Sequence, residues 1–254
     1  MRLLECIPKE CELMARLPKE IWYIGNKELL ECRKVSIVGT RRPLAYTKDF
    51  TYKLARALAK RGVVVVSGAA MGVDAIAHQG AGVDRTIAVM ANGLDIRYPS
   101  VNKNLIADIE KKGLSVSFYE AGFRARSWSF VARNELVVAL GEVLIVTEAE
   151  LKSGSMRSVE YALKMGKEIF VLPHRLSDSS GTNSLLLEGK AKAIYDIEAF
   201  ADNFGVAELK EDPFIKFLET SPTLEEALSK YGERVYEAEL EGLIFIKDGV
   251  VQVL

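Results

Sequence analysis

Glycines, hydroxyl side chains and cations gather in four short segments of this sequence. They are Gly39-Thr40-Arg41-Arg42, Ser67-Gly68, the segment around Asn92, and Lys152-Ser153-Gly154-Ser155. Glycine lets a backbone N–H approach a phosphate closely, hydroxyl groups donate further hydrogen bonds, and Arg or Lys adds positive charge. A structural role in a tight turn explains any one of these segments. Four of them together favour a polyphosphate or a nucleic-acid backbone as the ligand.

A fifth segment, residues 123–134, alternates arginines with aromatic residues. Arg124 and Arg126 precede Trp128 and Phe130 in what we expect to be a loop. Such a loop offers charge for phosphates and flat faces for bases, and stacking of one base on an aromatic side chain contributes about 1–3 kcal/mol. The alternative is that Trp128 and Phe130 are buried anchors of a long loop.

Catalytic and cofactor-binding patterns are harder to find. Four carboxylates come near the ends of predicted strands: Asp74, Asp95, Glu120 and Glu148. No Ser-His-Asp order joins them, and the two histidines, His78 and His174, are too far apart in sequence to suggest a zinc site. The first strand is not followed by the dinucleotide motif GxGxxG, and the phosphate loop GxxxxGKS/T does not occur. We therefore expect no enzyme activity, no cofactor and no metal.

The elements that must position these segments alternate along the chain. Short β-branched runs predict strands at Val35–Val38, Val63–Val66, Thr86–Met90, Leu114–Phe118, Val143–Thr147, Glu168–Leu172 and Ala193–Tyr195. Segments of helical period predict helices at Thr47–Arg61, Val73–Gly80, Asn102–Lys112, Val131–Leu140 and Met156–Met165. Strands that are apolar on both faces and separated by helices indicate an α/β, Rossmann-like, doubly wound and mostly parallel sheet. The candidate segments then follow the carboxyl ends of the strands, where such sheets bind ligands.

Three parts are predicted along the chain. Residues 1–34 show two short helical patterns broken by Pro8 and Pro18, which we expect to form a helical lead-in packed on the main domain. Residues 35–207 are the Rossmann-like domain. Residues 208–254 begin with a charged junction and are expected to form three helices and a hairpin turning at residues 247–249, the order of elements in a winged helix.

The formal net charge of -1 conceals two parts of opposite sign. Residues 1–204 hold 29 basic and 24 acidic side chains, whereas residues 205–254 hold 5 basic and 11 acidic ones. A DNA-reading winged helix needs a basic recognition helix, yet residues 233–241 contain four glutamates against Arg234 alone. The C-terminal module is therefore predicted to repel a duplex and to contact protein or regulate.

The distribution of apolar residues and cysteines excludes membrane and secreted proteins as classes. The first residues contain no apolar run long enough for a signal peptide, and no run is long enough to span a membrane. Cys6, Cys11 and Cys32 give an odd count without a disulfide framework, which favours a reduced cytoplasm.

The succession of motifs resembles the DNA-processing protein family DprA, also called Smf. The matching segments are Ser36–Arg41, Ser67–Asp74 with Ala77-His78, Thr86–Val89, Gly93–Asp95, Tyr98-Pro99, Arg133-Asn134, Lys152–Ser155 and Ser180–Asn183. The resemblance covers roughly residues 35–200. It implies binding and protection of single-stranded DNA taken up in natural transformation, loading of the recombinase RecA onto that strand, and no catalysis. It also implies a homodimer formed through the Rossmann-like domain.

The residue types and the resemblance together give a set of predicted contacts with single-stranded DNA. Arg42 is expected to be the main phosphate clamp and Phe130 the base contact, with backbone amides of Gly39, Gly68 and Lys152–Ser155 around the phosphates. The full set is Gly39, Thr40, Arg41, Arg42, Ser67, Gly68, Asn92, Arg126, Ser127, Phe130, Arg133, Asn134, Lys152, Ser153, Gly154 and Ser155.

Departures from the family pattern leave the exact contacts in these loops open, and a related Rossmann-like enzyme group offers an alternative function. Ala91, Pro173-His174 and Ser127 stand where the family usually has glycine, Pro-Gly and often a basic residue. The alternative is a nucleoside monophosphate phosphoribohydrolase resembling the LOG enzymes, whose Pro-Gly-Gly-x-Gly-Thr motif is followed by a glutamate. Here that loop lacks the glycine pair, but Glu160 lies near where the glutamate would follow.

Overall fold

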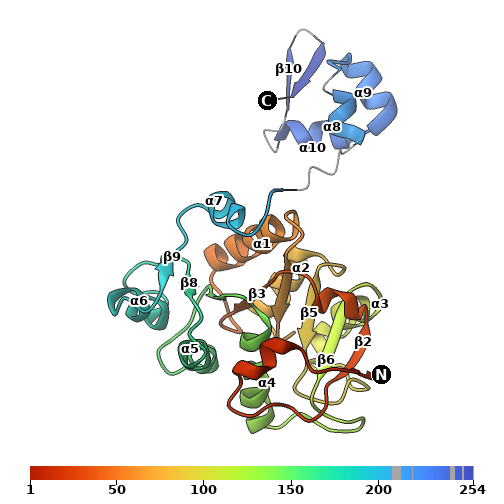
Figure 1. Ribbon diagram of the computed structural model, residues 1–254. Helices are drawn as coiled ribbons and strands as arrows, with labels where there is room; N and C mark the ends of the chain where they lie inside the picture. Colours follow the sequence, from red (N-terminus) through yellow and green to blue (C-terminus); the bar gives the residue numbers. More distant parts are fainter. Residues whose placement is uncertain (208–212, 219, 241–243, 248, 254) are drawn as a thin grey trace. The chain divides into compact units, whose positions relative to one another are not determined.

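The chain divides into two compact units, which we call the main unit, Met1–Ala207, and the C-terminal unit, Glu208–Leu254. A computed structural model describes the whole main unit and, in the C-terminal unit, residues 213–218, 220–240, 244–247 and 249–253 (Figure 1). Each unit is described by itself.

A nine-stranded sheet forms the centre of the main unit, all of whose residues are described. The strands are β1 (Arg2–Leu3), β2 (Trp22–Gly25), β3 (Lys34–Val38), β4 (Val64–Ser67), β5 (Thr86–Val89), β6 (Leu114–Ser117), β7 (Leu144–Val146), β8 (Ile169–Val171) and β9 (Lys192–Ala193). Their order is β1-β2-β6-β5-β4-β3-β7-β8-β9. All pairs from β6 to β9 are parallel. The prediction of a Rossmann-like α/β fold is confirmed.

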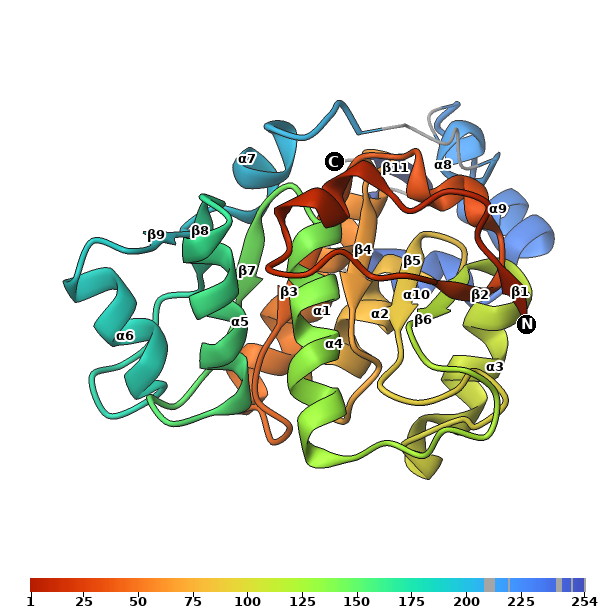
Figure 2. The ribbon, with the colours of Figure 1, turned by 60° about the horizontal axis from the view of Figure 1, so that its bottom comes forward.

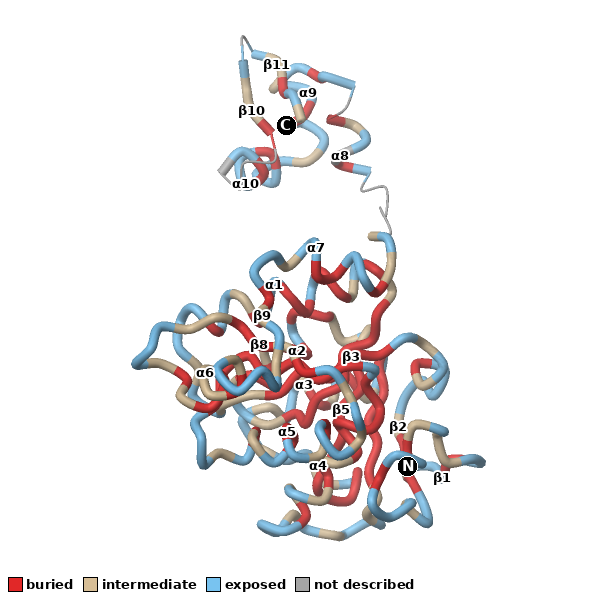
Figure 3. The backbone as a smooth tube through the Cα atoms, turned by 60° about the vertical axis from the view of Figure 1, so that its left-hand side comes forward, coloured by how far each residue is buried: buried red, intermediate tan, exposed pale blue. Residues whose placement is uncertain are grey.

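Helices cover both faces of this sheet because the strands are apolar on both (Figure 2). One face carries α1 (Ala45–Ala59), α2 (Val73–Ala81), α3 (Lys103–Lys112) and α7 (Ile197–Asp202). The other carries α4 (Ser127–Leu140), α5 (Gly154–Lys164) and α6 (Ser180–Leu187). Figure 3 shows the buried strands enclosed by helices that are exposed on their outer sides. The loops between them are thereby fixed at the carboxyl ends of the strands.

The lead-in of residues 1–34 differs from its prediction. Two short 3-10 helices are present, Lys9–Leu13 and Lys27–Leu30, but the segment also contributes β1 and β2. Strand β2 pairs antiparallel with β6, so the lead-in extends the sheet at one edge. The description of the segment as helical is therefore wrong for both strands. The cause is the run Trp22-Tyr23-Ile24, whose residues favour strands and pack beside β6.

Helix α4 begins at Ser127, four residues before the predicted start at Val131. The Ser129 hydroxyl accepts from the Arg126 N–H and donates to the Arg126 carbonyl, each at 2.8 Å, which closes the first turn. Trp128 and Phe130 therefore lie on a helix and not in a loop. Trp128 is 54% exposed and Phe130 is half-buried, so they are not buried anchors.

The C-terminal unit has its own small core. Its described elements are α8 (Pro213–Leu218), α9 (Leu224–Tyr231), α10 (Arg234–Leu240) and the antiparallel strands β10 (Ile244–Lys247) and β11 (Val250–Val253). Phe214, Leu218, Val235 and Val251 pack together inside it. The elements follow the predicted order, and the winged-helix assignment stays a prediction. Parts of that prediction lie outside the described residues, namely residues 208–212, Glu219, Glu241 and Asp248.

Within the described residues, no helix is both long enough and apolar enough to cross a lipid bilayer.

Candidate nucleic-acid interface

The sheet order reverses between β3 and β7, and this reversal creates a crevice at the carboxyl ends of the strands. From β3 the chain proceeds through β4 and β5 in one direction, whereas β7 and β8 lie on the other side. The loops after β3 and β7 therefore leave in opposite directions, which is the standard position for a ligand site in an open parallel sheet.

An outer recess of about 560 Å³ lies at this reversal. Its lining comes from the loop after β3, from the first two turns of α4 and from the start of α5. The predicted contacts among its lining residues are Gly39, Thr40, Arg41, Ser127, Phe130, Arg133, Asn134, Ser153, Gly154 and Ser155. The hydroxyl of Ser153 is buried and has no hydrogen-bond partner in the described residues, so a donor or acceptor is available to a ligand there.

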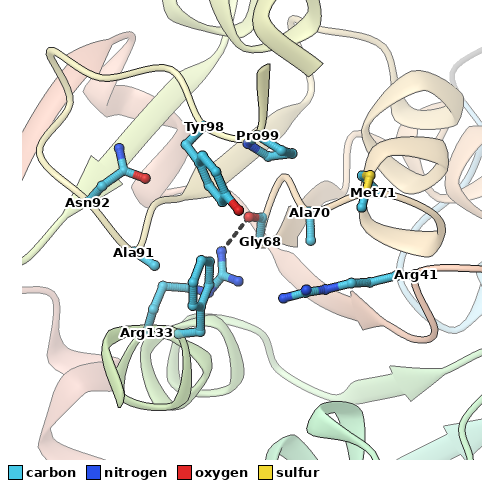
Figure 4. A pocket seen from close by; sticks show the side chains of 10 residues that line it. Arg41, Gly68, Ala70, Met71, Ala91, Asn92, Tyr98, Pro99 and Arg133 are labelled. Carbon is cyan, nitrogen blue, oxygen red and sulfur yellow. Dashed lines mark hydrogen bonds between the residues drawn. The ribbon is translucent and has the colours of Figure 1, made fainter. Parts of the chain in front are cut away.

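A smaller inner recess of about 30 Å³ continues from it toward β4 and β5 (Figure 4). Arg41 lines both recesses, and its guanidinium lies 5.6 Å from the centre of the Phe130 ring. Tyr98, 49% exposed, lies 6.0 Å from the same ring. Asn92 donates to the Gly93 and Ile96 carbonyls, but its buried Oδ1 has no partner in the described residues. The inner recess thus combines ring faces, the two cations Arg41 and Arg133, and one free acceptor.

Arg133 forms the floor of both recesses. It is only 4% exposed, and its guanidinium donates to the carbonyl oxygen of Gly68 and to that of Val89, the latter at 2.5 Å. A side chain on Gly68 would collide with this guanidinium and would displace it from its present position. Burial is the main cause that lowers the pKa of Arg133, and nearby Arg41 lowers it further. The Nη1 and Nε donors are occupied by the protein, whereas no described residue accepts from Nη2. Arg133 therefore offers a bound anion its charge and the N–H groups of Nη2.

Two buried titratable groups belong to this region: Asp74, which lines the outer recess, and His78, which lines neither recess. Burial raises the pKa of Asp74, an effect that the charge of Arg133 opposes. Burial also lowers the pKa of His78 to about 3. The His78 Nδ1 lies 2.6 Å from the Thr86 hydroxyl, which itself donates to the Val65 carbonyl, so Nδ1 carries the proton. A buried imidazole with so low a pKa is a poor general base at neutral pH.

Glu148 has a structural role at the same edge. Its carboxylate accepts from the Leu44 N–H at 3.0 Å and from the Thr47 hydroxyl at 2.5 Å, at the start of α1. A carboxylate at this position satisfies the free amides and interacts favourably with the helix dipole. The backbone carbonyl of Glu148 also accepts from the Thr40 N–H, which fixes the loop after β3.

Four predicted contacts lie outside the two recesses. Arg42, Arg126 and Lys152 are exposed and line neither of them. Ser67 is fully buried and its hydroxyl donates to the Ile37 carbonyl at 2.7 Å, so its side chain is not exposed to either recess. Arg41, and not its neighbour Arg42, therefore lines the recesses, and the phosphate clamp at Arg42 stays a prediction.

Sequence reasoning missed Tyr98 and Met71 as lining residues of the inner recess. Tyr98 lies in the same loop after β5 as Asn92. An aromatic residue in a candidate loop was therefore the signal that could have identified it. Met71 has no comparable signal, because a single exposed methionine after a strand is ordinary. Within the described residues, no group of three or more His, Cys, Asp or Glu side chains is placed to hold a metal ion.

A family model for DNA recombination-mediator protein A matches residues 3–205. The chain belongs to this family. DNA processing protein DprA of Streptococcus pneumoniae is 34% identical over 189 residues, which cover 73% of this chain and 67% of that protein. DprA of Bacillus subtilis is 35% identical over 186 residues, covering 71% and 62%. The resemblance to the DprA/Smf family is confirmed.

Solved structures of DprA proteins share the fold. DNA processing protein A from Helicobacter pylori, whose structure concerns its single-stranded DNA binding mode, is 46% identical with a TM-score of 0.78 and covers 79% of this chain and 94% of that one. DprA from Streptococcus pneumoniae is 32% identical with a TM-score of 0.74, covering 80% and 72%. Protein Smf of Synechocystis is 35% identical over 180 residues, 68% of this chain and 45% of that protein. The chain thus spans about half to two thirds of the curated DprA/Smf relatives.

Three further candidate carboxylates, Glu160, Asp95 and Glu120, line neither recess. Glu160 is exposed on α5, where it pairs with Arg157 at 2.9 Å, and it lines neither recess. Asp95 is exposed and accepts two hydrogen bonds from the Gly122 N–H at 2.9 Å. Glu120 is exposed as well. The glutamate that kept the phosphoribohydrolase alternative open therefore has no place beside the recesses.

Proposed function

We propose that this protein binds single-stranded DNA through the outer and inner recesses and acts as a binding protein without catalysis. The observation that carries the proposal is the position of Arg41, which lines both recesses beside the Phe130 ring. A cation next to an open aromatic face is the combination that single-stranded nucleic acid requires. The single-stranded DNA binding mode of the Helicobacter pylori relative supports the same ligand class.

Phosphates would be held in the outer recess. Gly39–Arg41 and Ser153–Ser155 line it, the Ser153 hydroxyl has no partner among the described residues, and Arg133 adds positive charge. A base would contact Phe130 and Tyr98 at the entrance of the inner recess. The site thus separates an ionic contribution to affinity from a stacking contribution, and each can be removed alone.

We extend the proposal to the partners that the family suggests. The bound strand would be protected during natural transformation and passed to the recombinase RecA in the cytoplasm, with two copies of the main unit forming a homodimer. DNA processing proteins of Streptococcus pneumoniae and Bacillus subtilis are the relatives that support this extension. Sedimentation at micromolar concentration, with and without oligonucleotide, tests the dimer.

The binding proposal is tested with labelled oligo-dT at several salt concentrations. The affinity of a phosphate-bound strand falls with salt, and in single strands the slope of log K against log salt decreases by about 0.7 for each phosphate that the protein no longer neutralises. We expect Arg41→Ala to weaken binding and to flatten the slope by about that amount. Arg42→Ala is the matched control and should change both quantities less, because Arg42 lines neither recess.

Two results would overturn this proposal. Absence of oligo-dT binding at low salt removes single-stranded DNA as the ligand. Release of free base from AMP by the purified protein supports the phosphoribohydrolase instead.

A further inference from the structure

Three aromatic rings form a cluster beside the recesses, at the point where β6 ends and α4 begins. Tyr119 and Phe123 are stacked, with ring centres 4.2 Å apart and planes within 10°. The Trp128 ring meets both edge-on, at 5.9 Å from Tyr119 and 5.7 Å from Phe123. We call these three rings the Trp128 platform. None of them lines the outer or the inner recess.

Trp128 remains 54% exposed although it contacts two other rings. Tyr119 and Phe123 are already stacked on each other, so the pair does not depend on the indole for its own packing. The indole therefore presents an open ring face that is held in place from behind. Rigid, partly exposed aromatic side chains of this kind supply binding energy at low cost in conformational entropy.

Two cations flank the platform. Arg124 and Arg126 are exposed, and within the fully described main unit neither forms an ion pair. Glu120 is the acidic residue of the same segment and is exposed as well. Two arginines outside any ion pair against one carboxylate give the segment that carries the exposed indole a net positive charge. This charge favours an anionic partner with flat groups.

The platform is continuous with the proposed DNA site. Ser127, Phe130 and Asn134 recur at the spacing of one helix face and line the outer recess. Trp128 lies on the same first turn of α4 but projects at a different angle, beside that face. A strand that leaves the recess past Phe130 toward β6 must therefore pass Trp128.

We propose that the Trp128 platform is a second contact for the same single strand. One base stacks on the open face of Trp128, and Arg124 and Arg126 hold the phosphates on either side of it. The inference rests on the proposed function and extends it, because it assigns a direction to the strand, from the recesses toward the β6 side of the sheet. It also gives a role to Arg126, which the recesses leave outside.

The first test uses the fluorescence of Trp128 itself. The chain has two tryptophans, and Trp22→Phe leaves Trp128 as the only indole. Oligo-dT of about four nucleotides should occupy the recesses with little effect on the emission, whereas an oligomer of about sixteen should quench it and shield it from acrylamide. Tight binding of the long oligomer with unchanged emission and unchanged acrylamide quenching overturns the platform.

The second test compares variants on both lengths of oligo-dT. We expect Trp128→Ala to weaken the long oligomer about 5- to 100-fold and the short one less than about twofold, with Trp128→Phe retaining most of the affinity. Arg41→Ala should weaken both lengths. Tyr195→Ala is the control, since Tyr195 is 86% exposed beyond β9 at the opposite edge of the sheet.

The outcomes separate the two proposals. If the unaltered protein binds neither oligomer, the proposed function fails and the platform with it. If it binds both and Trp128→Ala leaves the long oligomer as tight as before, only the platform fails, and its exposed ring then serves another partner. Thermal unfolding of Trp128→Ala near that of the unaltered chain assigns any loss of affinity to the missing ring.

Discussion

A cation lies over an aromatic ring in both units of this chain, but the surroundings differ. In the main unit Arg41 lies 5.6 Å from the Phe130 ring, and both side chains line recesses at the carboxyl ends of parallel strands. In the C-terminal unit Arg234 lies 4.5 Å from the Phe214 ring, and Phe214 is 2% exposed within the core. Arg234 and Phe214 are thus the closer pair, but the buried Phe214 ring has no face left for a ligand.

The difference shows that a cation and a ring do not by themselves make a nucleic-acid site. The main unit adds an open ring face, unpartnered polar atoms on Asn92 and Ser153, and a buried positive charge on Arg133. The C-terminal unit adds glutamates, among them Glu225, Glu237 and Glu239. The comparison therefore supports the proposal that single-stranded DNA contacts the main unit.

Loss of the buried cation should have the largest effect. We expect Arg133→Met to lower the free energy of unfolding of the main unit by about 3–5 kcal/mol, because Asp74 loses its counter-charge and the Gly68 and Val89 carbonyls lose their donor. Arg234→Met, which removes an exposed cation over a core ring, should cost about 1 kcal/mol or less. Denaturant unfolding followed by fluorescence and by circular dichroism measures both. Equal losses would mean that the two cations have equivalent roles.

Acidification should lower the stability of the main unit more than that of the C-terminal unit. The pKa of His78 is about 3 in the folded chain and 6.5 when unfolded, so its contribution to stability is complete above pH 6.5 and is lost as the pH falls toward 3. We expect the main unit to lose about 2 kcal/mol between pH 7 and pH 5 from this residue. The raised pKa of Asp74 acts in the opposite direction and reduces the slope.

Tryptophan fluorescence reports this loss selectively, because Trp22 and Trp128 are both in the main unit. The C-terminal unit has no histidine and should show no such slope. His78→Gln is the control and should flatten the dependence. A stability of the unaltered protein that stays constant from pH 7 to pH 5 contradicts the assignment.

The sequence was sufficient for the alternation of strands and helices from β3 onward, because apolar β-branched runs separated by helical periods have few other solutions. It was insufficient for the lead-in. Strand β2 has only four residues, Trp22–Gly25, and exists because β6 offers it an edge, which is a tertiary cause. The predicted start of α4 was wrong for a local reason. The Ser129 hydroxyl closes the first turn of the helix, whereas the arginines and Trp128 in this segment had indicated a loop.

The sequence was sufficient to predict which loops form the candidate site but not which side chains line it. Periodicity placed Gly39, Phe130 and Ser153 at one edge of the sheet, and the structure brings them around one recess. Deciding which of Arg41 and Arg42 lines the recesses required the direction of each side chain. The sequence of two adjacent arginines in a loop does not reveal that direction. The burial of Arg133 and Ser67 likewise depends on neighbouring strands, and no local pattern marks it.

Removal of the stacking ring should have a smaller effect than loss of the buried cation. We expect Phe130→Ala to weaken oligo-dT binding by about 1–3 kcal/mol while leaving the salt dependence nearly unchanged, because stacking is not ionic. Tyr236→Ala, which removes a ring that is 46% exposed in the C-terminal unit, should leave affinity unchanged. Fluorescence anisotropy at several salt concentrations measures both variants. A changed slope without a changed affinity would mean that Phe130 positions Arg41 and does not contact a base.

The smallest effect is expected from the acidic side chains of the C-terminal unit. Exposed charges are screened within about 8 Å at physiological salt, so the double variant Glu237→Gln and Glu239→Gln should change oligo-dT affinity by less than about twofold unless the strand touches this unit. Crosslinking of photoreactive oligo-dT should accordingly label the main unit and not residues 213–254. A gain of tenfold in the double variant, or crosslinks to α10, would show that the C-terminal unit meets the strand directly. In that event the contrast between Phe130 and Phe214 would reflect two different modes of contact with DNA and not the presence and absence of one.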